Sequence, residues 1–216
     1  MKKENLKNLY FGGSLLLSFV LWTALVKFVD VKAIGPRESE VGFAALNGFF
    51  HNLTGVNMTL YTVTDWLGLI PLAVVAGFGL LGLIQWVRRR HLKRVDYSIY
   101  VLGGFYIVTF AAFIFFEKVV INYRPVLIGG VLEASYPSST TLLVTCVMPT
   151  ALMQLNRRLK SKPFKITIAA LICGFTVFIV AARLFSGVHW LTDIIGGALL
   201  SVGLVILYRY FVGIKS

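Results

Sequence analysis

The sequence predicts an all-α, polytopic membrane protein. Of its 216 residues, 57% are hydrophobic and only 14% are charged, whereas soluble domains average about 25% charged residues. The apolar residues form runs near the length that a helix needs to cross a bilayer about 30 Å thick. Six such runs occur, at 10–29, 66–87, 97–116, 141–155, 166–182 and 190–212. We therefore expect a single membrane-embedded domain over residues 1–216 with six transmembrane helices.

The runs and the segments between them predict the elements in order. The run 10–29 is too long for a signal peptide, and no clear small-residue cleavage site follows it, so we expect a mature helix. Residues 41–65 are half polar and rich in aromatics, which predicts an interfacial or re-entrant segment covering the outer face. The run 141–155 is short unless its helix begins within the preceding Ser/Thr stretch. Cys146 and Cys173 lie inside runs as small hydrophobes, without metal-ligand spacing.

The basic residues predict the orientation of the helices. Lys and Arg number 21 against 9 acidic residues, and 15 of the 21 lie in 1–9, 88–96, 156–165 or near the C-terminus, at Arg209 and Lys215. Because basic connections stay on the cytoplasmic side, we expect both termini in the cytoplasm of a bacterial cell and the protein in its plasma membrane. The positions of these charges favour contact with anionic lipid headgroups rather than nucleic acid.

Three polar segments are not explained by topology. They are 117–125 (EKVVINYRP), 136–141 (YPSSTT) and 183–193 (RLFSGVHWLTD). The predicted orientation places all three at the outer ends of helices, and ionisable residues in such places are functional candidates. We therefore expect one extracytoplasmic site at the membrane–water boundary.

The last segment carries a candidate nucleophile. His189 and Asp193 are four residues apart, on one face of a helix. A carboxylate there can hold one imidazole nitrogen and leave the other free as a nucleophile or base. The alternative is an interfacial His–Asp pair that merely ends a helix. Arg183 lies six residues before His189, across Gly187, whose missing side chain lets another group approach closely.

The other two segments complete a candidate phosphate site. Arg124 is followed by Pro125, which stiffens its loop, and an arginine fork suits phosphate oxygens. Lys118 is either a further phosphate ligand or a lysine that snorkels to the interface. A helix start with outward N–H groups is an anion site. The residues that form this start are Ser138, Ser139 and Thr140.

Together these motifs resemble the type 2 phosphatidic acid phosphatases, over roughly residues 60–212. The resemblance rests on Arg124-Pro125, on Pro-Ser at the head of the next helix, and on Arg183-x5-His189-x3-Asp193. It implies six transmembrane helices, an active site facing away from the cytoplasm and no metal or other cofactor. It further implies that His189 attacks phosphorus to give a phosphohistidine that water hydrolyses. By the same resemblance Asp193 orients His189, and Arg124, Arg183 and Ser138 hold the phosphate oxygens.

Two departures from the family pattern affect the expected chemistry. In the family, six residues lie between a Lys and the Arg-Pro pair, whereas only five residues lie between Lys118 and Arg124, and Glu117 takes the expected register. The family's second motif reads Pro-Ser-Gly-His, and here Thr140 stands where that histidine would protonate the leaving group. General acids typically contribute about 10²–10⁴-fold.

Three explanations of the missing acid stay open. In the first, the substrate is a lipid pyrophosphate, whose leaving phosphate has a second pKa of about 6 and departs unaided. In the second, His51 donates the proton. In the third, the protein binds or transports a lipid phosphate without hydrolysing it. The leading expectation is hydrolysis of a membrane lipid phosphate or pyrophosphate, for example an isoprenoid carrier lipid or phosphatidic acid. A phosphoryl transferase using the same intermediate is the alternative within the family.

Overall fold

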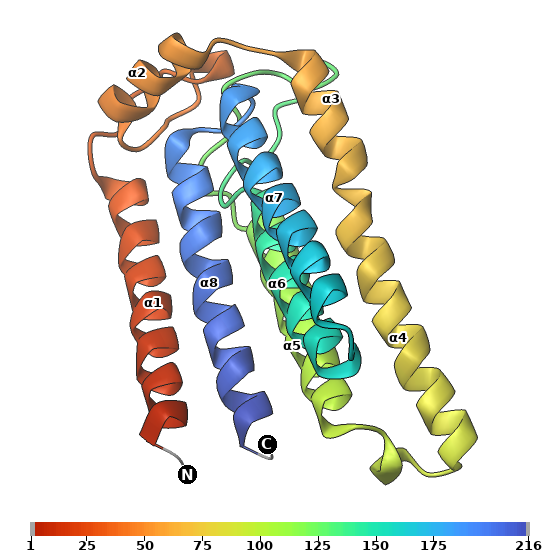
Figure 1. The fold of residues 1–216 in the computed structure, drawn as a ribbon. Helices are drawn as coiled ribbons and strands as arrows, with labels where there is room; N and C mark the ends of the chain where they lie inside the picture. Colours follow the sequence, from red (N-terminus) through yellow and green to blue (C-terminus); the bar gives the residue numbers. More distant parts are fainter. Residues whose placement is uncertain (1–2, 215–216) are drawn as a thin grey trace.

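The computed structural model describes residues 3–214, and most of them are helical. Long helices lie side by side in a bundle, and α2 lies across one end of it (Figure 1). The helices are α1 (Lys3–Phe28), α2 (Ala44–Thr54), α3 (Met58–Leu67), α4 (Leu69–Arg89), α5 (Tyr97–Lys118), α6 (Ser139–Arg158), α7 (Lys162–Phe185) and α8 (Leu191–Gly213), with short 3-10 turns η1 (Pro36–Glu38) and η2 (Leu92–Arg94). The predicted all-α class is confirmed.

Each predicted apolar run corresponds to a helix of the bundle to within one residue, except that 66–87 begins in α3 and continues through α4. Five helical segments are long and apolar enough to cross a membrane. They are Asn5–Phe28, Met58–Arg89, Tyr97–Lys118, Lys162–Phe185 and Leu191–Gly213. The remaining run forms α6, which has 20 residues but lacks the apolarity of the others. The protein is therefore a multi-pass membrane protein, and the count of six crossings stays a prediction.

The lower apolarity of α6 follows from its place in the bundle. It contacts α4, α5, α7 and α8, so much of its surface faces protein rather than lipid. Its buried hydroxyls bond within the helix, as when Thr150 Oγ1 donates to the carbonyl of Cys146 at 2.8 Å. Enclosed helices tolerate such residues because neighbouring helices replace the lipid. The helix also begins at Ser139, inside the Ser/Thr stretch, which supplies the length missing from 141–155.

The helix α8 is the most enclosed of the spans, and α1 packs along it. Gly203 makes this approach possible, since a Cβ there would lie 2.8 Å from the side chain of Leu16. At the other end of the contact, Trp22 Nε1 donates to the carbonyl of Thr192 at 3.1 Å. These contacts fix the start of α8, the helix that carries Asp193.

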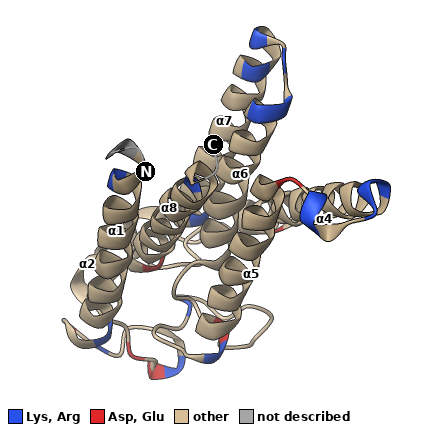
Figure 2. Cartoon of the chain, turned by 90° about the horizontal axis from the view of Figure 1, so that it is seen from below, with Lys and Arg blue, Asp and Glu red and all other residues tan. Residues whose placement is uncertain are grey.

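The two termini lie at one end of the bundle with the α4–α5 and α6–α7 connections (Figure 1). Figure 2 shows Lys and Arg gathered at both connections. Asp96 links three helices there, because its carboxylate accepts from Gln85 at 2.8 Å and Arg89 at 2.9 Å and lies 3.5 Å from Arg158. The basic segments that the sequence assigned to one side thus share one end of the fold.

The opposite end is closed by the segment 41–65. Within it, α2 lies across the bundle and α3 runs into α4 (Figure 1). Asn47 pins α2 to α8, since its amide donates to Thr192 Oγ1 at 2.9 Å. Gly187 lets the α7–α8 turn press against the α2–α3 turn, because a Cβ there would lie 1.9 Å from the carbonyl oxygen of Gly55. The interfacial position of this segment stays a prediction.

Candidate active site

The three polar segments meet at the end of the bundle opposite the termini. The first follows α5, the second begins α6, and the third is the turn between α7 and α8. His189 lies at their centre and is 4% exposed. Of the predicted site residues, Arg124, Arg183 and Asp193 are all buried around it.

The imidazole of His189 is held with Nε2 as an acceptor. Nε2 lies 3.1 Å from Nη1 of Arg124 and 3.2 Å from Nη2 of Arg183. A guanidinium only donates, so Nε2 carries a lone pair and the ring proton lies on Nδ1. Burial, together with the two guanidinium charges, lowers the pKa of His189 well below its usual 6.5. The ring is therefore neutral at neutral pH, as a nucleophile requires.

Ser135 connects His189 to Asp193. Its hydroxyl lies 3.1 Å from Nδ1 of His189 and donates to Oδ2 of Asp193. The direct separation of Nδ1 and Oδ2 is 3.7 Å, too long for a hydrogen bond. The sequence predicted that Asp193 orients His189, and the structure places a hydroxyl between them. Ser135 directly precedes the motif YPSSTT, but nothing in the sequence distinguished it from the other serines.

Asp193 is fixed from two further directions. The backbone N–H of Trp190 donates to Oδ2 at 2.9 Å, and the side-chain amide of Asn122 donates to Oδ1 at 3.4 Å. Both oxygens of this fully buried carboxylate therefore have donors. Asn122 lies in the segment before Arg124, and sequence reasoning gave it no role.

Arg183 is held in position by α3. Its side chain is 1% exposed, and its guanidinium lies 4.9 Å from the ring centre of Tyr61. Nη1 donates to Thr64 Oγ1 at 3.4 Å and lies 3.8 Å from the carboxylate of Asp65. Nε is buried without a hydrogen-bond partner among the described residues. Leaving a buried donor without a hydrogen-bond partner costs free energy. The Nε edge of this guanidinium is therefore suited to a bound anion.

Arg124 is held by its own loop. Its backbone N–H donates to the carbonyl of Glu133 at 3.0 Å, and Nε lies 3.0 Å from a carboxylate oxygen of the same residue. The guanidinium also lies 6.0 Å from the ring centre of Tyr61. Both arginines therefore flank one aromatic ring and face one imidazole nitrogen.

The three hydroxyl residues at the start of α6 have different surroundings. Ser138 is buried and caps the helix, because its Oγ accepts from the N–H of Thr141 at 3.4 Å. Ser139 lines a pocket beside His189. The methyl group of Thr140 lies toward Gly68 at the α3–α4 junction, and Thr140 is absent from the lining of that pocket. The first N–H groups of a helix have no acceptor within it, so this end can still offer donors to a phosphate.

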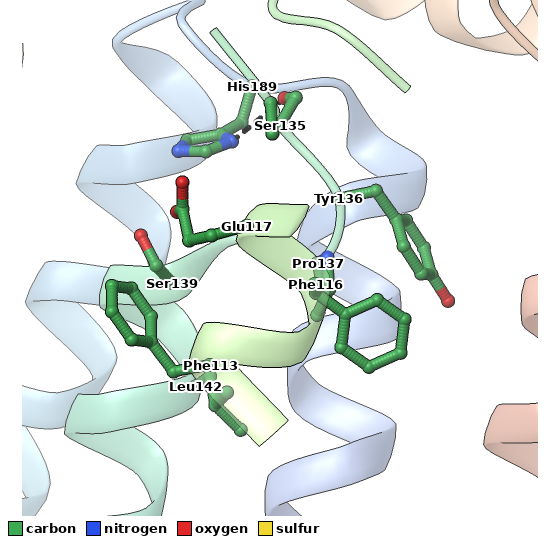
Figure 3. A pocket seen from close by; sticks show the side chains of 10 residues that line it. Phe113, Phe116, Glu117, Ser135, Tyr136, Pro137, Ser139, Leu142 and His189 are labelled. Atoms are coloured by element: carbon green, nitrogen blue, oxygen red, sulfur yellow. Dashed lines mark hydrogen bonds between the residues drawn. The ribbon is translucent and has the colours of Figure 1, made fainter. Parts of the chain in front are cut away.

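The pocket beside His189 is lined by Glu117 rather than Lys118 (Figure 3). Lys118 is exposed at the end of α5 and is absent from the lining. Figure 3 shows the carboxylate of Glu117 pointing toward the imidazole, with the hydroxyl of Ser139 close by. The structure thus brings to the pocket the carboxylate of Glu117, which takes the family's register, and not the ammonium group of Lys118.

His51 lies near the site but outside this pocket. Its ring centre is 5.4 Å from that of Trp190, and its Nδ1 is buried without a hydrogen-bond partner among residues 3–214. Burial lowers the pKa of His51. A neutral imidazole is a poor proton donor, so the geometry does not favour His51 as the missing acid.

Comparisons with known proteins support the family resemblance. A model of the PAP2 superfamily matches residues 123–215, which contain Arg124, Arg183, His189 and Asp193. A search of curated protein sequences found no match. A solved structure, the first transmembrane PAP2-type phosphatidylglycerolphosphate phosphatase from Bacillus subtilis, is 19% identical, with a TM-score of 0.62 over 96% of this chain and 98% of that chain. At that identity the likeness shows a shared fold.

Proposed function

We propose that this chain, whose residues 123–215 match a model of the PAP2 superfamily, hydrolyses a membrane lipid pyrophosphate or phosphate through a phosphohistidine on His189. The observation that carries the proposal is the neutral Nε2 of His189, which faces two guanidinium groups at 3.1 and 3.2 Å. A phosphoryl group bound by both arginines would place its phosphorus next to this lone pair.

The first chemical step uses groups that are already in position. The Nε2 lone pair attacks phosphorus, the N–P bond forms, and the bond from phosphorus to the leaving oxygen breaks with its electron pair. The ring then becomes cationic. Its Nδ1–H faces Ser135, which bonds Asp193, so the carboxylate stabilises the new charge through the hydroxyl. Arg124 and Arg183 bind the phosphoryl oxygens.

The geometry favours a pyrophosphate over a monophosphate. A lipid monophosphate must expel an alkoxide, which needs a proton, whereas a pyrophosphate expels a lipid phosphate that is stable as an anion. Thr140 does not line the pocket, and His51 is neutral and lies outside it. Neither residue supplies the acid that an alkoxide requires.

A lipid tail has a place beside the site. An apolar groove with a volume of about 650 Å³ lies between α4 and α5, and the α5 residues along it include Phe110 and Ile114. The next turn of α5 carries Phe113 and Glu117, which line the pocket beside His189. A lipid bound with its phosphates at His189 would extend its chain down this groove. The site lies opposite the basic connections, which supports an extracytoplasmic active site.

The test is phosphate release by purified protein in detergent. The substrates are the pyrophosphate and monophosphate of one isoprenyl alcohol, and His189→Ala is the control. We expect the pyrophosphate to react about 100-fold faster or more, matching the absent general acid, and a ³²P label to remain on wild type but not on His189→Ala. Equal rates on both substrates would contradict the leaving-group argument.

Two further outcomes separate the alternatives. Phosphate transfer only when a lipid acceptor is added would indicate a transferase. Binding without phosphate release or covalent label would indicate a silent binder or transporter. Thr140→His combined with Ser139→Gly should raise the monophosphate rate selectively, because only that reaction lacks a proton at its leaving group.

A further inference from the structure

The carboxylate of Glu117 is the one acidic group in the lining of the pocket beside His189. It comes from the last turn of α5, and Figure 3 shows it on the side of the imidazole away from the Ser135 bond, toward Nε2. Among the described side chains, those of residues 5–214, no ion pair involves it. Arg124 and Arg183 have carboxylate neighbours of their own in Glu133 and Asp65.

An unpaired carboxylate is out of place in a site that only binds phosphate. Two like charges about 4 Å apart repel by about 1 kcal/mol even in bulk water and by more near protein. Glu117 therefore weakens binding of an anionic substrate, and its place in the pocket calls for another role. An ionised carboxylate accepts protons and does not donate them, so it does not replace a missing general acid.

The second half of the proposed reaction needs a proton acceptor. After the lipid phosphate leaves, water must attack the phosphohistidine and lose a proton. We propose that Glu117 is the general base that takes this proton; this inference rests on the proposed function. The water oxygen bonds to phosphorus, the N–P bond breaks with its electron pair returning to Nε2, and one water proton moves to the carboxylate. Inorganic phosphate leaves, and the proton passes to solvent.

The size of the pocket favours water as the acceptor. The space there that can take the centre of a water-sized sphere is about 10 Å³, about the minimum that one water molecule needs. The space suits a single water molecule and not a second lipid headgroup. Ser139, whose hydroxyl lies near the Glu117 carboxylate, offers a further hydrogen bond to that water (Figure 3).

The division of labour also explains how the site works without the histidine expected at Thr140. A histidine can act first as acid and then as base. With a pyrophosphate substrate the acid is unnecessary, and a carboxylate suffices as base for the second step. The site then needs one proton acceptor near Nε2, and Glu117 is in that place.

The test is rapid-quench kinetics of the full chain with an isoprenyl pyrophosphate labelled in its terminal phosphate. Glu117→Gln keeps the shape and removes the base. We expect a full burst of lipid monophosphate, accumulation of phosphohistidine, and steady-state phosphate release slower by about 10²-fold or more. The matched control is Glu40→Gln, which removes an exposed carboxylate of the α1–α2 connection and should leave burst and steady state unchanged.

A second variant separates chemistry from structure. Glu117→Ala should recover phosphate release when formate or acetate is added, because a small carboxylate can occupy the vacated space and accept the proton. An equal fall in burst and steady state, faster turnover in Glu117→Gln, or no recovery with added carboxylate would each overturn the assignment. If wild type itself forms no phosphohistidine, the proposed function fails instead.

Discussion

Replacing Ser135 with alanine should slow the chemical step while leaving substrate binding intact. The hydroxyl connects Nδ1 of His189, at 3.1 Å, to Oδ2 of Asp193. Without it the two atoms stand 3.7 Å apart, beyond hydrogen-bond range. The imidazole gains positive charge as Nε2 bonds phosphorus, so the lost contact matters most in the transition state.

The size of the effect follows from the burial of the network. A buried polar group left without its partner costs about 1–3 kcal/mol, which corresponds to a fall of about 5- to 150-fold in kcat. KM should change little, because the phosphate ligands Arg124 and Arg183 are untouched. The assay is steady-state and burst kinetics on an isoprenyl pyrophosphate, with Ser14→Ala as the control because it removes an exposed hydroxyl on α1.

A double-mutant cycle tests the connection itself. If Ser135 transmits the effect of Asp193, Asp193→Asn should cost much less in the Ser135→Ala background than in wild type. Wild-type kcat in Ser135→Ala would refute the reasoning. If the fall in kcat of the double mutant equalled the product of the two single falls, the reasoning would be refuted as well, because the residues would then act independently.

Three other outcomes are expected. The pKa of His189 is lowered by burial and by the neighbouring guanidinium charges, so the ring stays unprotonated to below pH 6.5. In a pH profile of kcat/KM, the loss of activity on the acidic side should therefore have its midpoint below pH 6.5. A midpoint at 6.5 or higher would contradict this expectation. Arg183→Lys should reduce kcat/KM about 10- to 150-fold, since an ammonium cannot supply the fork that binds two oxygens; near-normal activity would remove Arg183 from the phosphate site. Gly187→Ala should lower the Tm, because the φ of +65° and a carbonyl oxygen 1.9 Å from the new Cβ both oppose a side chain. The left-handed backbone conformation alone costs about 1–2 kcal/mol. Gly174→Ala in α7, with open space around it, is the control, and equal Tm values for the two variants would contradict this prediction.

Much of the architecture is determined by the sequence alone. Apolar runs of bilayer length specify the helices, because backbone groups in lipid must bond within their own segment. The polar groups left at the helix ends then point to the site. Arg124, Arg183, His189 and Asp193 are identified from motif spacing, and the structure brings all four together.

The tertiary structure decided the relations between neighbours. Glu117 and Lys118 differ by about 100° around α5, and the packing of that helix turns Glu117, and not Lys118, into the pocket. Ser135 bonds residues that are 54 and 58 positions away, so no local pattern could predict it. The sequence periodicity determines which residues share a helix face. The rotation of each helix, and the loop atoms that meet across the bundle, depend on contacts between distant segments.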